Sequence, residues 1–217
     1  MTELTRKAMS IVSWEQIQEM VNQGAAENFK PGDEVTQVME DGSTGVFVVR
    51  AVNHYQDGEV VFVAKDCIGP DRPMNDRWTN AGGWKDSEMR KYMNEELVKL
   101  FPAEMLAVMA KKKTVQIVNG ESVECEDLLF LPSEYEVFGE EIFGKHNGVD
   151  KQYPHYADRR NRISYDCDGD STWKWLASPS ASNTTNFCLV YYNGYADSNA
   201  GASNSYGVAP GFVIRKS

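Results

Sequence analysis

The feature that most constrains the fold is a set of three β-rich runs that follow one another closely. Turn signals at Asp41-Gly42 and Asp57-Gly58 separate the runs, which cover Glu34–Met39, Gly45–Val52 and Glu59–Ala64. An Asp-Gly pair between two β-rich runs is a strong signal for a hairpin turn. The spacing therefore predicts an antiparallel meander, which begins after the chain break at Pro31-Gly32-Asp33.

Helices are expected on both sides of this meander. Ser13 and Gln16 have the spacing of a capping box, and the amphipathic stretch behind them predicts a first helix that ends near Gln23. A second helix is predicted between Gly82-Gly83-Trp84 and Pro102, with an apolar stripe made of Met89, Tyr92, Met93, Leu97 and Leu100. A shorter helix from Pro102 to about Ala110 should follow, because proline suits the first helical turn.

The rest of the chain predicts further strands and then an irregular region. Thr114–Val118 and Leu128–Leu131 are the next strand candidates, and polar, aromatic and glycine-rich segments follow them up to a final apolar run, Gly211–Ile214. The expected class is α+β, with antiparallel strands, two or three helices and a long irregular C-terminal segment. We expect a helical segment at residues 1–30 and one domain at residues 31–217, whose core contains Trp84, Trp173 and Trp175.

The charge of the chain excludes some classes of partner. The formal net charge is −10 and the pI is about 4.8. Because this charge opposes phosphate backbones and anionic membrane faces, we expect no nucleic-acid partner. No apolar run is long enough to cross a bilayer, and the first residues lack the apolar centre and cleavage site of a signal peptide. We therefore expect synthesis in the cytoplasm and no membrane insertion.

The sequence predicts neither a metal nor a cofactor. The four cysteines are widely scattered without a close CxxC pair, and the three histidines share no metal-ligand spacing. Asp166, Asp168 and Asp170 resemble a calcium loop only superficially, because Gly169 falls between the second and third aspartate. An exposed acidic turn is the preferred interpretation there.

The segment Ser180–Tyr206 has the most unusual composition in the chain. At the chain's average of 25% charged residues, a stretch of 27 residues should hold about seven, but this one holds a single charge, Asp197. It also contains four of the ten tyrosines and five asparagines. Disordered linkers are poor in aromatics, whereas antibody-type binding loops combine Tyr with Ser, Gly and Asn. The composition therefore favours a binding surface over a linker or a purely structural loop.

Asn193-Gly194 predicts a two-residue hairpin turn inside this segment, with Tyr192 and Tyr195 directly opposite each other. A regular ladder would place tyrosines on both faces of that hairpin, which a single flat display surface does not need. Either the ladder is irregular or one tyrosine packs inward, and both alternatives stay open at this stage.

Five blocks of the sequence resemble a widespread domain of bacterial and phage proteins with a C-type-lectin-like fold. They are Trp14-Glu15-Gln16-Ile17, Asn80-Ala81-Gly82-Gly83-Trp84, Ser87-Glu88-Met89-Arg90-Lys91-Tyr92-Met93-Asn94, Leu131-Pro132-Ser133-Glu134-Tyr135-Glu136-Val137-Phe138-Gly139 and Trp175-Leu176-Ala177-Ser178-Pro179. The last block departs from the family pattern, since Ala177 stands where the family often has arginine, and the final strand lacks the Val-Arg-Pro ending.

The C-terminal part resembles the variable proteins of diversity-generating retroelements. The residues that carry this resemblance are Asn186-Phe187-Cys188, Val190, Gly194, Ala196, Ser203-Asn204-Ser205 and Gly207-Val208-Ala209-Pro210-Gly211-Phe212. In that family, errors at template adenines convert asparagine codons into many others, but not into codons for Lys, Glu, Gln, Met or Trp, and these five types are absent from Ser180–Tyr206. The resemblance implies ligand-binding positions that vary, namely Leu189, Tyr191, Tyr192, Asn193, Tyr195, Asp197, Ser198, Asn199, Ser203 and Tyr206.

The function that this resemblance implies is binding without catalysis. The partner would be a protein or another cell-surface molecule, the role would be receptor recognition by a phage or prophage, and a place on the virion is expected. Two alternatives stay open. A formylglycine-generating type of enzyme would need a closely spaced pair of reactive cysteines, whereas Cys167 and Cys188 are far apart. A calcium-dependent sugar lectin would need a Glu-Pro-Asn or Gln-Pro-Asp triplet, which the sequence lacks.

Overall fold

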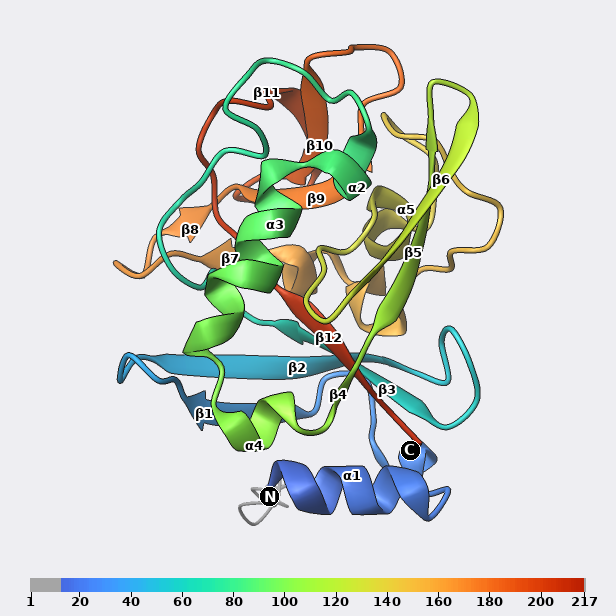
Figure 1. The fold of residues 1–217 in the computed structure, drawn as a ribbon, viewed down its shortest axis with the longest axis vertical. Helices are drawn as coiled ribbons and strands as arrows, with labels where there is room; N and C mark the ends of the chain where they lie inside the picture. The colour runs from blue at the N-terminus through green and yellow to red at the C-terminus, as the bar shows by residue number, and fades with distance from the viewer. Residues whose placement is uncertain (1–12, 217) are drawn as a thin grey trace, which may run out of the picture.

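The protein has an α+β fold with antiparallel sheets, as the sequence predicts. The computed structural model describes residues 13–216. Its largest sheet has five strands in the order β1-β2-β3-β12-β4, with bounds Glu34–Val38, Thr44–Val52, Glu59–Ala64, Gly211–Arg215 and Met109–Ala110. A second sheet has three strands in the order β11-β10-β9, with bounds Ala196–Gly201, Asn186–Val190 and Lys174–Pro179. The two sheets occupy opposite parts of the molecule in Figure 1.

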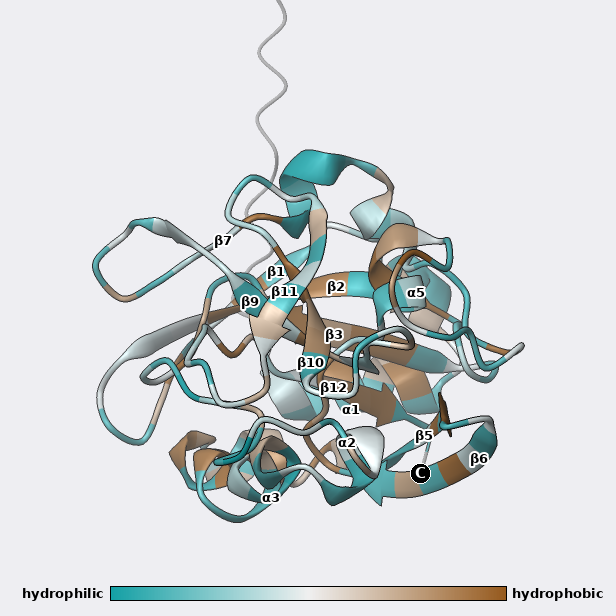
Figure 2. Cartoon of the chain, turned by 90° about the horizontal axis from the view of Figure 1, so that it is seen from above, coloured by the Kyte–Doolittle hydropathy of each residue, from teal (hydrophilic) through white to brown (hydrophobic). Residues whose placement is uncertain are grey.

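The predicted meander is confirmed, and the last strand completes it. β1, β2 and β3 pair as consecutive antiparallel neighbours. The final apolar run becomes β12, which lies between β3 and β4 with Phe212 opposite Phe62. All six residues of β3 are buried, as expected for a central strand covered on both faces. Apolar residues gather on such central strands in Figure 2.

The first helix, α1 (Trp14–Asn22), packs against this sheet. Its capping box is confirmed, because the Ser13 and Gln16 side chains each accept a bond from the other residue's backbone N–H. Trp14 is 3% exposed and meets the rings of Phe47, Phe62 and Phe212 edge-on at centroid distances of 6.2, 5.5 and 5.6 Å. The helical segment proposed for residues 1–30 therefore shares the core of the following domain, while its residues 1–12 lie outside the described residues.

The second predicted helix is broken into shorter elements. They are α2 (Gly83–Asp86), α3 (Glu88–Glu95) and the 3₁₀ turn η2 (Leu97–Leu100). The break falls at Ser87, whose extended backbone and side-chain bond to the Arg90 N–H cap a new helix. The expected burial of Met89, Met93 and Leu97 is confirmed.

The third predicted helix is shorter than expected. α4 covers only Ala103–Leu106, because Met109–Ala110 pairs with β12. With α5 (Glu134–Phe138), residues 13–216 contain five α-helices rather than two or three, and none has both the length and the apolar character needed to span a membrane. Further 3₁₀ turns are η1 (Ala26–Asn28), η3 (Pro154–Ala157) and η4 (Arg159–Arg162).

The strand predicted at Leu128–Leu131 is wrong, and a strand just before it was missed. β5 (Lys112–Val118) pairs with β6 (Glu121–Asp127) through a turn in which Asn119 and Gly120 have φ values of 51° and 83°. This is the Asn-Gly hairpin signal with both residues left-handed. Leu129, Phe130 and Leu131 are core residues, but among them only Phe130 forms an isolated bridge, with Gly211. A second hairpin joins β7 (Ser164–Tyr165) to β8 (Ser171–Thr172).

We predict that replacing Trp14 by alanine lowers the free energy of unfolding by about 3–5 kcal/mol, because the change empties a buried aromatic site between helix and sheet. Urea unfolding followed by circular dichroism measures this. Glu19→Ala, on the exposed face of the same helix, is the control and should change stability by less than about 0.5 kcal/mol. Equal effects of the two substitutions would show that α1 contributes little to the core.

Candidate binding surface

The segment Ser180–Tyr206 forms β10, β11 and their connections, and a buried asparagine holds its base. Asn80 is 6% exposed, and its side-chain amide donates to the carbonyl oxygens of Ser180, Asn183 and Asn186 at 3.0, 2.9 and 2.8 Å. Its backbone N–H donates to the Thr184 carbonyl at 2.8 Å. The amide thereby fixes the loop against the domain, and it adds to the N–H donors that the Asn183 and Asn186 carbonyls already have within the loop.

The residues after Asn80 explain why this anchor is rigid. Gly83 has a φ of 60°, and a Cβ at that position would lie 2.7 Å from the Val118 side chain and 2.8 Å from that of Gln116. Only glycine allows this close approach. The Gln116 amide accepts from the Trp84 backbone N–H and donates to the Ala177 carbonyl, which joins α2, β5 and β9.

The turn between β10 and β11 differs from the predicted one. The Tyr191 N–H donates to the Tyr195 carbonyl at 2.7 Å, and the Gly194 N–H donates to the Tyr191 carbonyl at 2.8 Å. Gly194 has a φ of 86°, whereas the φ of Asn193 is not positive. The loop therefore has three residues, Tyr192 to Gly194, and Tyr195 lies opposite Tyr191 rather than Tyr192.

Gly194 decides which of the two turns forms. It is buried against η4, and a Cβ there would lie 2.5 Å from the Arg159 carbonyl oxygen. The Arg159 guanidinium also donates to the Asn193 carbonyl and lies 4.7 Å from the centroid of the Tyr195 ring. The turn is thus attached to a neighbouring segment whose position no local sequence pattern reveals.

A β-bulge on β11 presents two of the predicted positions. Leu189 pairs with Asp197 and Phe187 with Ala200, so Ser198 and Asn199 lie together opposite one residue of β10. The Asp197 carboxylate accepts from the N–H groups of Ser198 and Asn199 at 2.6 and 2.8 Å. The ladder is therefore irregular, and the only charge of the segment stabilises its own backbone.

Four of the aromatic rings at this end of the molecule form a continuous stack. Trp173 lies between two tyrosines, with centroid distances of 4.5 Å to Tyr191 and 5.0 Å to Tyr206. Tyr191 in turn contacts Tyr192 at 4.4 Å. Burial raises the pKa of the Tyr206 hydroxyl, and the charge of Asp197 adds to this. Tyr191 packs inward on Trp173, so both alternatives left open by the sequence occur together.

Most of the predicted positions lie on this surface, and one does not. Tyr192 and Tyr195 are 43% and 59% exposed, Asn199 is exposed, and Tyr191, Asn193, Asp197, Ser198, Ser203 and Tyr206 are partly exposed. Leu189 is 0% exposed and belongs to the core, because its side chain lies on the inner face of the central strand β10. No ligand could contact it in this conformation.

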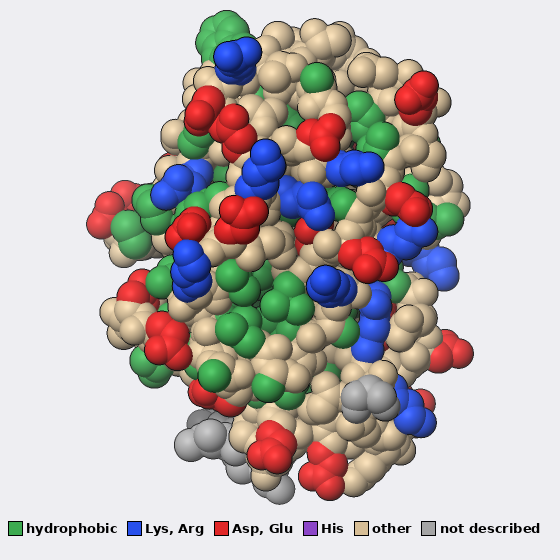
Figure 3. Space-filling view, viewed as in Figure 1, with side chains coloured by type: hydrophobic (Ala, Val, Ile, Leu, Met, Phe, Trp, Pro, Cys, Tyr) green, Lys and Arg blue, Asp and Glu red, His purple; other side chains and the backbone are tan. Residues whose placement is uncertain are grey.

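Residues outside the segment also contribute to the surface, and the sequence prediction missed them. Trp84 and Trp175 are in the core as expected, but Trp173 is partly exposed within the stack. Trp78 is 68% exposed, and Arg159 is exposed beside Tyr195. The sequence did hold one local signal for Trp78. Its neighbours Asp76 and Arg77 are charged, which favours an exposed position over a core position. Charged side chains crowd the middle of the face in Figure 3 and become sparse toward the end that carries β10 and β11.

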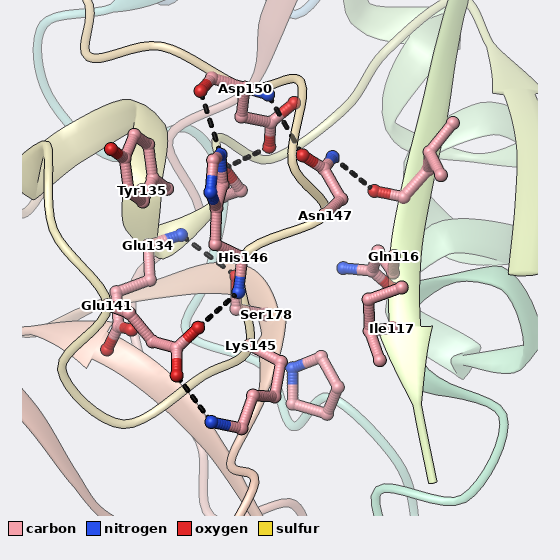
Figure 4. Close-up of a pocket in the computed structure, with 13 residues that line it drawn as sticks. Gln116, Ile117, Glu134, Tyr135, Glu141, Lys145, His146, Asn147, Asp150 and Ser178 are labelled. Carbon is pink, nitrogen blue, oxygen red and sulfur yellow. Dashed lines mark hydrogen bonds and ion pairs between the residues drawn. The ribbon is translucent and has the colours of Figure 1, made fainter. Parts of the chain in front are cut away.

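A small pocket lies away from this surface, between β5, α5 and the loop that follows α5 (Figure 4). It has room for about one water molecule. The Glu134 carboxylate accepts from the N–H groups of residues 142, 143 and 144, the Ser133 hydroxyl donates to Asp150, and the His146 ring stacks on Tyr135 at 3.6 Å. These polar groups are used to hold the loop itself, so the pocket has a structural role.

The acidic turn between β7 and β8 is held by hydrogen bonds to its own backbone. Within residues 13–216, no three His, Cys, Asp or Glu side chains are grouped so that they could hold a metal ion. Asp166 instead accepts from the N–H groups of Asp168 and Asp170, both at 3.0 Å, in the turn between β7 and β8. The three aspartates thus form an acidic turn stabilised by its own backbone.

A buried lysine, Lys174, follows Trp173 in the sequence and begins β9. Lys174 is 3% exposed, and its ammonium donates to the Ser164 hydroxyl at 2.7 Å. Burial lowers the pKa of Lys174 to about 7, and the positive charge of Arg50 lowers it further. The other buried lysine, Lys112, has a carboxylate partner, Glu136, at 2.8 Å, whereas within residues 13–216 no carboxylate forms an ion pair with Lys174.

The fold and surface define a class: an α+β protein with antiparallel sheets, in which the three-stranded sheet β11-β10-β9 carries an aromatic surface with few charges. The chain belongs to the family described as "Domain of unknown function (DUF6273)", which matches residues 58–216. No curated protein matches the chain. No solved structure matches it either.

We predict that Gly194→Ala destabilises the protein by at least about 1 kcal/mol more than Gly42→Ala. The two glycines have nearly equal φ values, 86° and 83°, but an added Cβ meets the Arg159 carbonyl at position 194 and nothing within 4 Å at position 42. Urea unfolding gives the free energies, and amide exchange of residues 191–195 reports the local effect. Equal losses would mean that the turn is not fixed against η4.

We predict that Lys174→Met changes how stability depends on pH. The folded pKa of Lys174, about 7, lies below the unfolded value of about 10.4, so between these pH values the unfolded chain binds more protons and stability rises with pH. From pH 7 to 9.5, the wild type should therefore gain about 2–3 kcal/mol relative to Lys174→Met. Urea unfolding at both pH values measures this difference. Parallel profiles would show that the ammonium is effectively solvated.

Proposed function

We propose that this protein is a non-enzymatic binding protein of the kind diversified by retroelements, with a C-type-lectin-like fold. The surface made by Tyr191, Tyr192, Asn193, Tyr195, Ser198 and Asn199 is its ligand-binding region, with Trp173, Ser203 and Tyr206 beside it. The partner is a protein or another cell-surface molecule, and the role is receptor recognition by a phage or prophage.

The observation that carries this proposal is the separation of two kinds of residue within one short segment. Of the positions proposed as fixed, Phe187, Val190, Val208 and Phe212 are at most 1% exposed, whereas Asn204 and Ser205 are exposed. Nine of the ten positions proposed as variable are at least partly exposed, and Leu189 is the exception. Exposed positions tolerate most replacements at a cost of less than about 0.5 kcal/mol, so a surface of this kind could change while the core stays intact.

The chemistry of the surface suits recognition by contact area. Tyrosine supplies a large amphipathic area with few rotatable bonds, and the stacking on Trp173 removes part of the remaining freedom before any ligand arrives. Because Asp197 is the only charged residue of the segment, long-range attraction by the segment should contribute little. The surface also faces away from α1 (Figure 1), so attachment through the N-terminal region would leave it accessible.

The cysteines give little support to the enzymatic alternative. Burial raises the pKa of both Cys67 and Cys125 to about 12, and that of Cys188 well above its ordinary value. A thiol with a raised pKa forms little of the reactive thiolate at neutral pH. Cys167 is exposed and free at the turn between β7 and β8, in a different element from Cys188 on β10.

The mechanism of diversification is tested by sequencing the DNA around the gene. We expect a reverse-transcriptase gene and a near-copy of the coding sequence for residues 180–206 that differs at adenines. Codon 189 deserves separate inspection, since the buried Leu189 should be restricted to apolar residues in any variant that folds. If the surrounding DNA contains neither a reverse-transcriptase gene nor such a near-copy, the proposal is contradicted.

We predict that the tyrosines dominate binding but unequally. Single alanine substitutions at Tyr191, Tyr192, Tyr195 and Tyr206 should include at least one loss of about 2 kcal/mol or more, with near-neutral neighbours. Tyr191 and Tyr192 should be energetically coupled in a double-mutant cycle, because their rings are in contact, whereas Tyr192 and Tyr195 are not paired across the turn.

Calorimetry tests this prediction with a protein partner isolated on the intact chain as bait. Tyr165→Ala is the matched control, because Tyr165 is 46% exposed but lies on β7, outside the surface. Unchanged affinity in all four tyrosine variants would place the interface elsewhere on the molecule.

A further inference from the structure

We propose that Trp78, which lies outside the diversified segment, is a constant anchor of the binding surface, and that the partner is a protein. This proposal rests on the proposed function and extends it in two ways. It adds a contact residue that diversification would not change, and it selects one class of ligand.

Trp78 is the most exposed large apolar side chain among the described residues, at 68%. Tryptophan is highly buried on average; Trp14, Trp84 and Trp175 are at most 3% exposed, and Trp173 is partly exposed. An exposed indole does not gain the free energy that burial of a large aromatic ring provides in the core. The same free energy becomes available when a partner covers the ring. Tryptophan is also the residue type most enriched among binding hot spots.

The loop that carries Trp78 is attached to the diversified segment on both sides. Before it, the Asn75 N–H donates to the Ala202 carbonyl at 3.0 Å. After it, the Asn80 N–H donates to the Thr184 carbonyl at 2.8 Å. Within the loop, the Asn75 side chain donates to the Thr79 carbonyl at 2.7 Å. Trp78 is therefore held at a fixed place relative to β10 and β11, so little ordering is needed when a ligand binds.

Trp78 lies at the far end of β11 from the tyrosine turn. A Cβ at Gly201, the last residue of β11, would be 3.6 Å from two atoms of the Trp78 indole. Tyr195 immediately precedes β11, and a strand of six residues spans about 17–20 Å. Trp78 is therefore separated from the exposed rings of Tyr192 and Tyr195 by about the length of β11. A surface of that width matches a protein interface, which buries about 800 Å² on each partner.

The same geometry disfavours a sugar ligand. Tyr191 and Tyr206 already contact the indole of Trp173, which leaves less of it for a sugar ring to stack on. The segment has one carboxylate, Asp197, and its Oδ1 already accepts two backbone N–H groups, so few acceptors are left for sugar hydroxyl groups. Separated aromatic rings with a single carboxylate among them fit an uncharged region of a protein surface.

The test uses the full-length chain displayed on yeast, with the codons for Tyr191, Tyr192, Asn193, Tyr195, Ser198 and Asn199 randomised. Clones are selected separately against lysozyme, ubiquitin and serum albumin, and in a further arm against chitohexaose. Trp78→Ala is then introduced into every selected clone. Val38→Ala, at an apolar position 60% exposed on β1 of the other sheet, is the control.

We expect clones against at least two of the proteins, and a loss of affinity of at least tenfold from Trp78→Ala in most of them. Val38→Ala should leave affinity unchanged, and the melting temperature of Trp78→Ala should stay within about 2 °C of the parent because the side chain is exposed. A loss below twofold in most protein-binding clones would overturn the anchor while leaving the proposed function intact.

Two other outcomes have separate meanings. Selection of chitohexaose binders without any protein binders would overturn the choice of a protein partner. Failure to select binders in any arm would refute the proposed function itself, and this proposal with it.

Discussion

The binding surface depends on the three hydrogen bonds that the buried Asn80 amide donates to the carbonyls of residues 180, 183 and 186. A loop with many small residues buries little apolar area, so burial alone offsets little of the entropy lost on ordering it. Without the Asn80 amide, its carbonyl groups would hydrogen-bond to water. One amide replaces that water at three points. Removing it would leave the Ser180 carbonyl without a protein donor, at a cost of about 1–3 kcal/mol if it stays buried, while the Asn183 and Asn186 carbonyls would keep one backbone donor each.

The elements around this amide pack closely, and their polar side chains form bonds within the protein. Gly83 allows α2 to lie against β5, and Gln116 connects both to β9. On the other side, α5 buries two glutamates: Glu134 binds backbone N–H groups of the following loop, and Glu136 pairs with Lys112. These buried carboxylates are fully used inside the protein. The groups free to meet a partner are therefore the aromatic and small polar side chains at the β10–β11 end.

The sequence was a good guide wherever neighbouring residues alone decide the structure. The β1–β2–β3 meander and the Ser13 capping box formed as predicted, because turn residues and caps act within a few positions. The composition of Ser180–Tyr206 also indicated a surface, and nine of its ten predicted positions are at least partly exposed. Predictions failed where distant contacts decide: Leu129, Phe130 and Leu131 are buried without forming a strand, and Leu189 belongs to the core although the resemblance placed it on the surface.

The two Asn-Gly dipeptides show where the division lies. At Asn119-Gly120 both residues adopt positive φ and form a two-residue turn, whereas at Asn193-Gly194 only the glycine does, and the loop has three residues. The sequence by itself determined that the chain reverses at both places, since Asn and Gly tolerate left-handed backbone. Only the tertiary structure decided the register, because Gly194 is pressed against the Arg159 carbonyl and a bulge follows at Ser198 and Asn199. A shift of one residue exchanges the faces of a strand, so this contact determines which tyrosines meet a partner and which pack on Trp173.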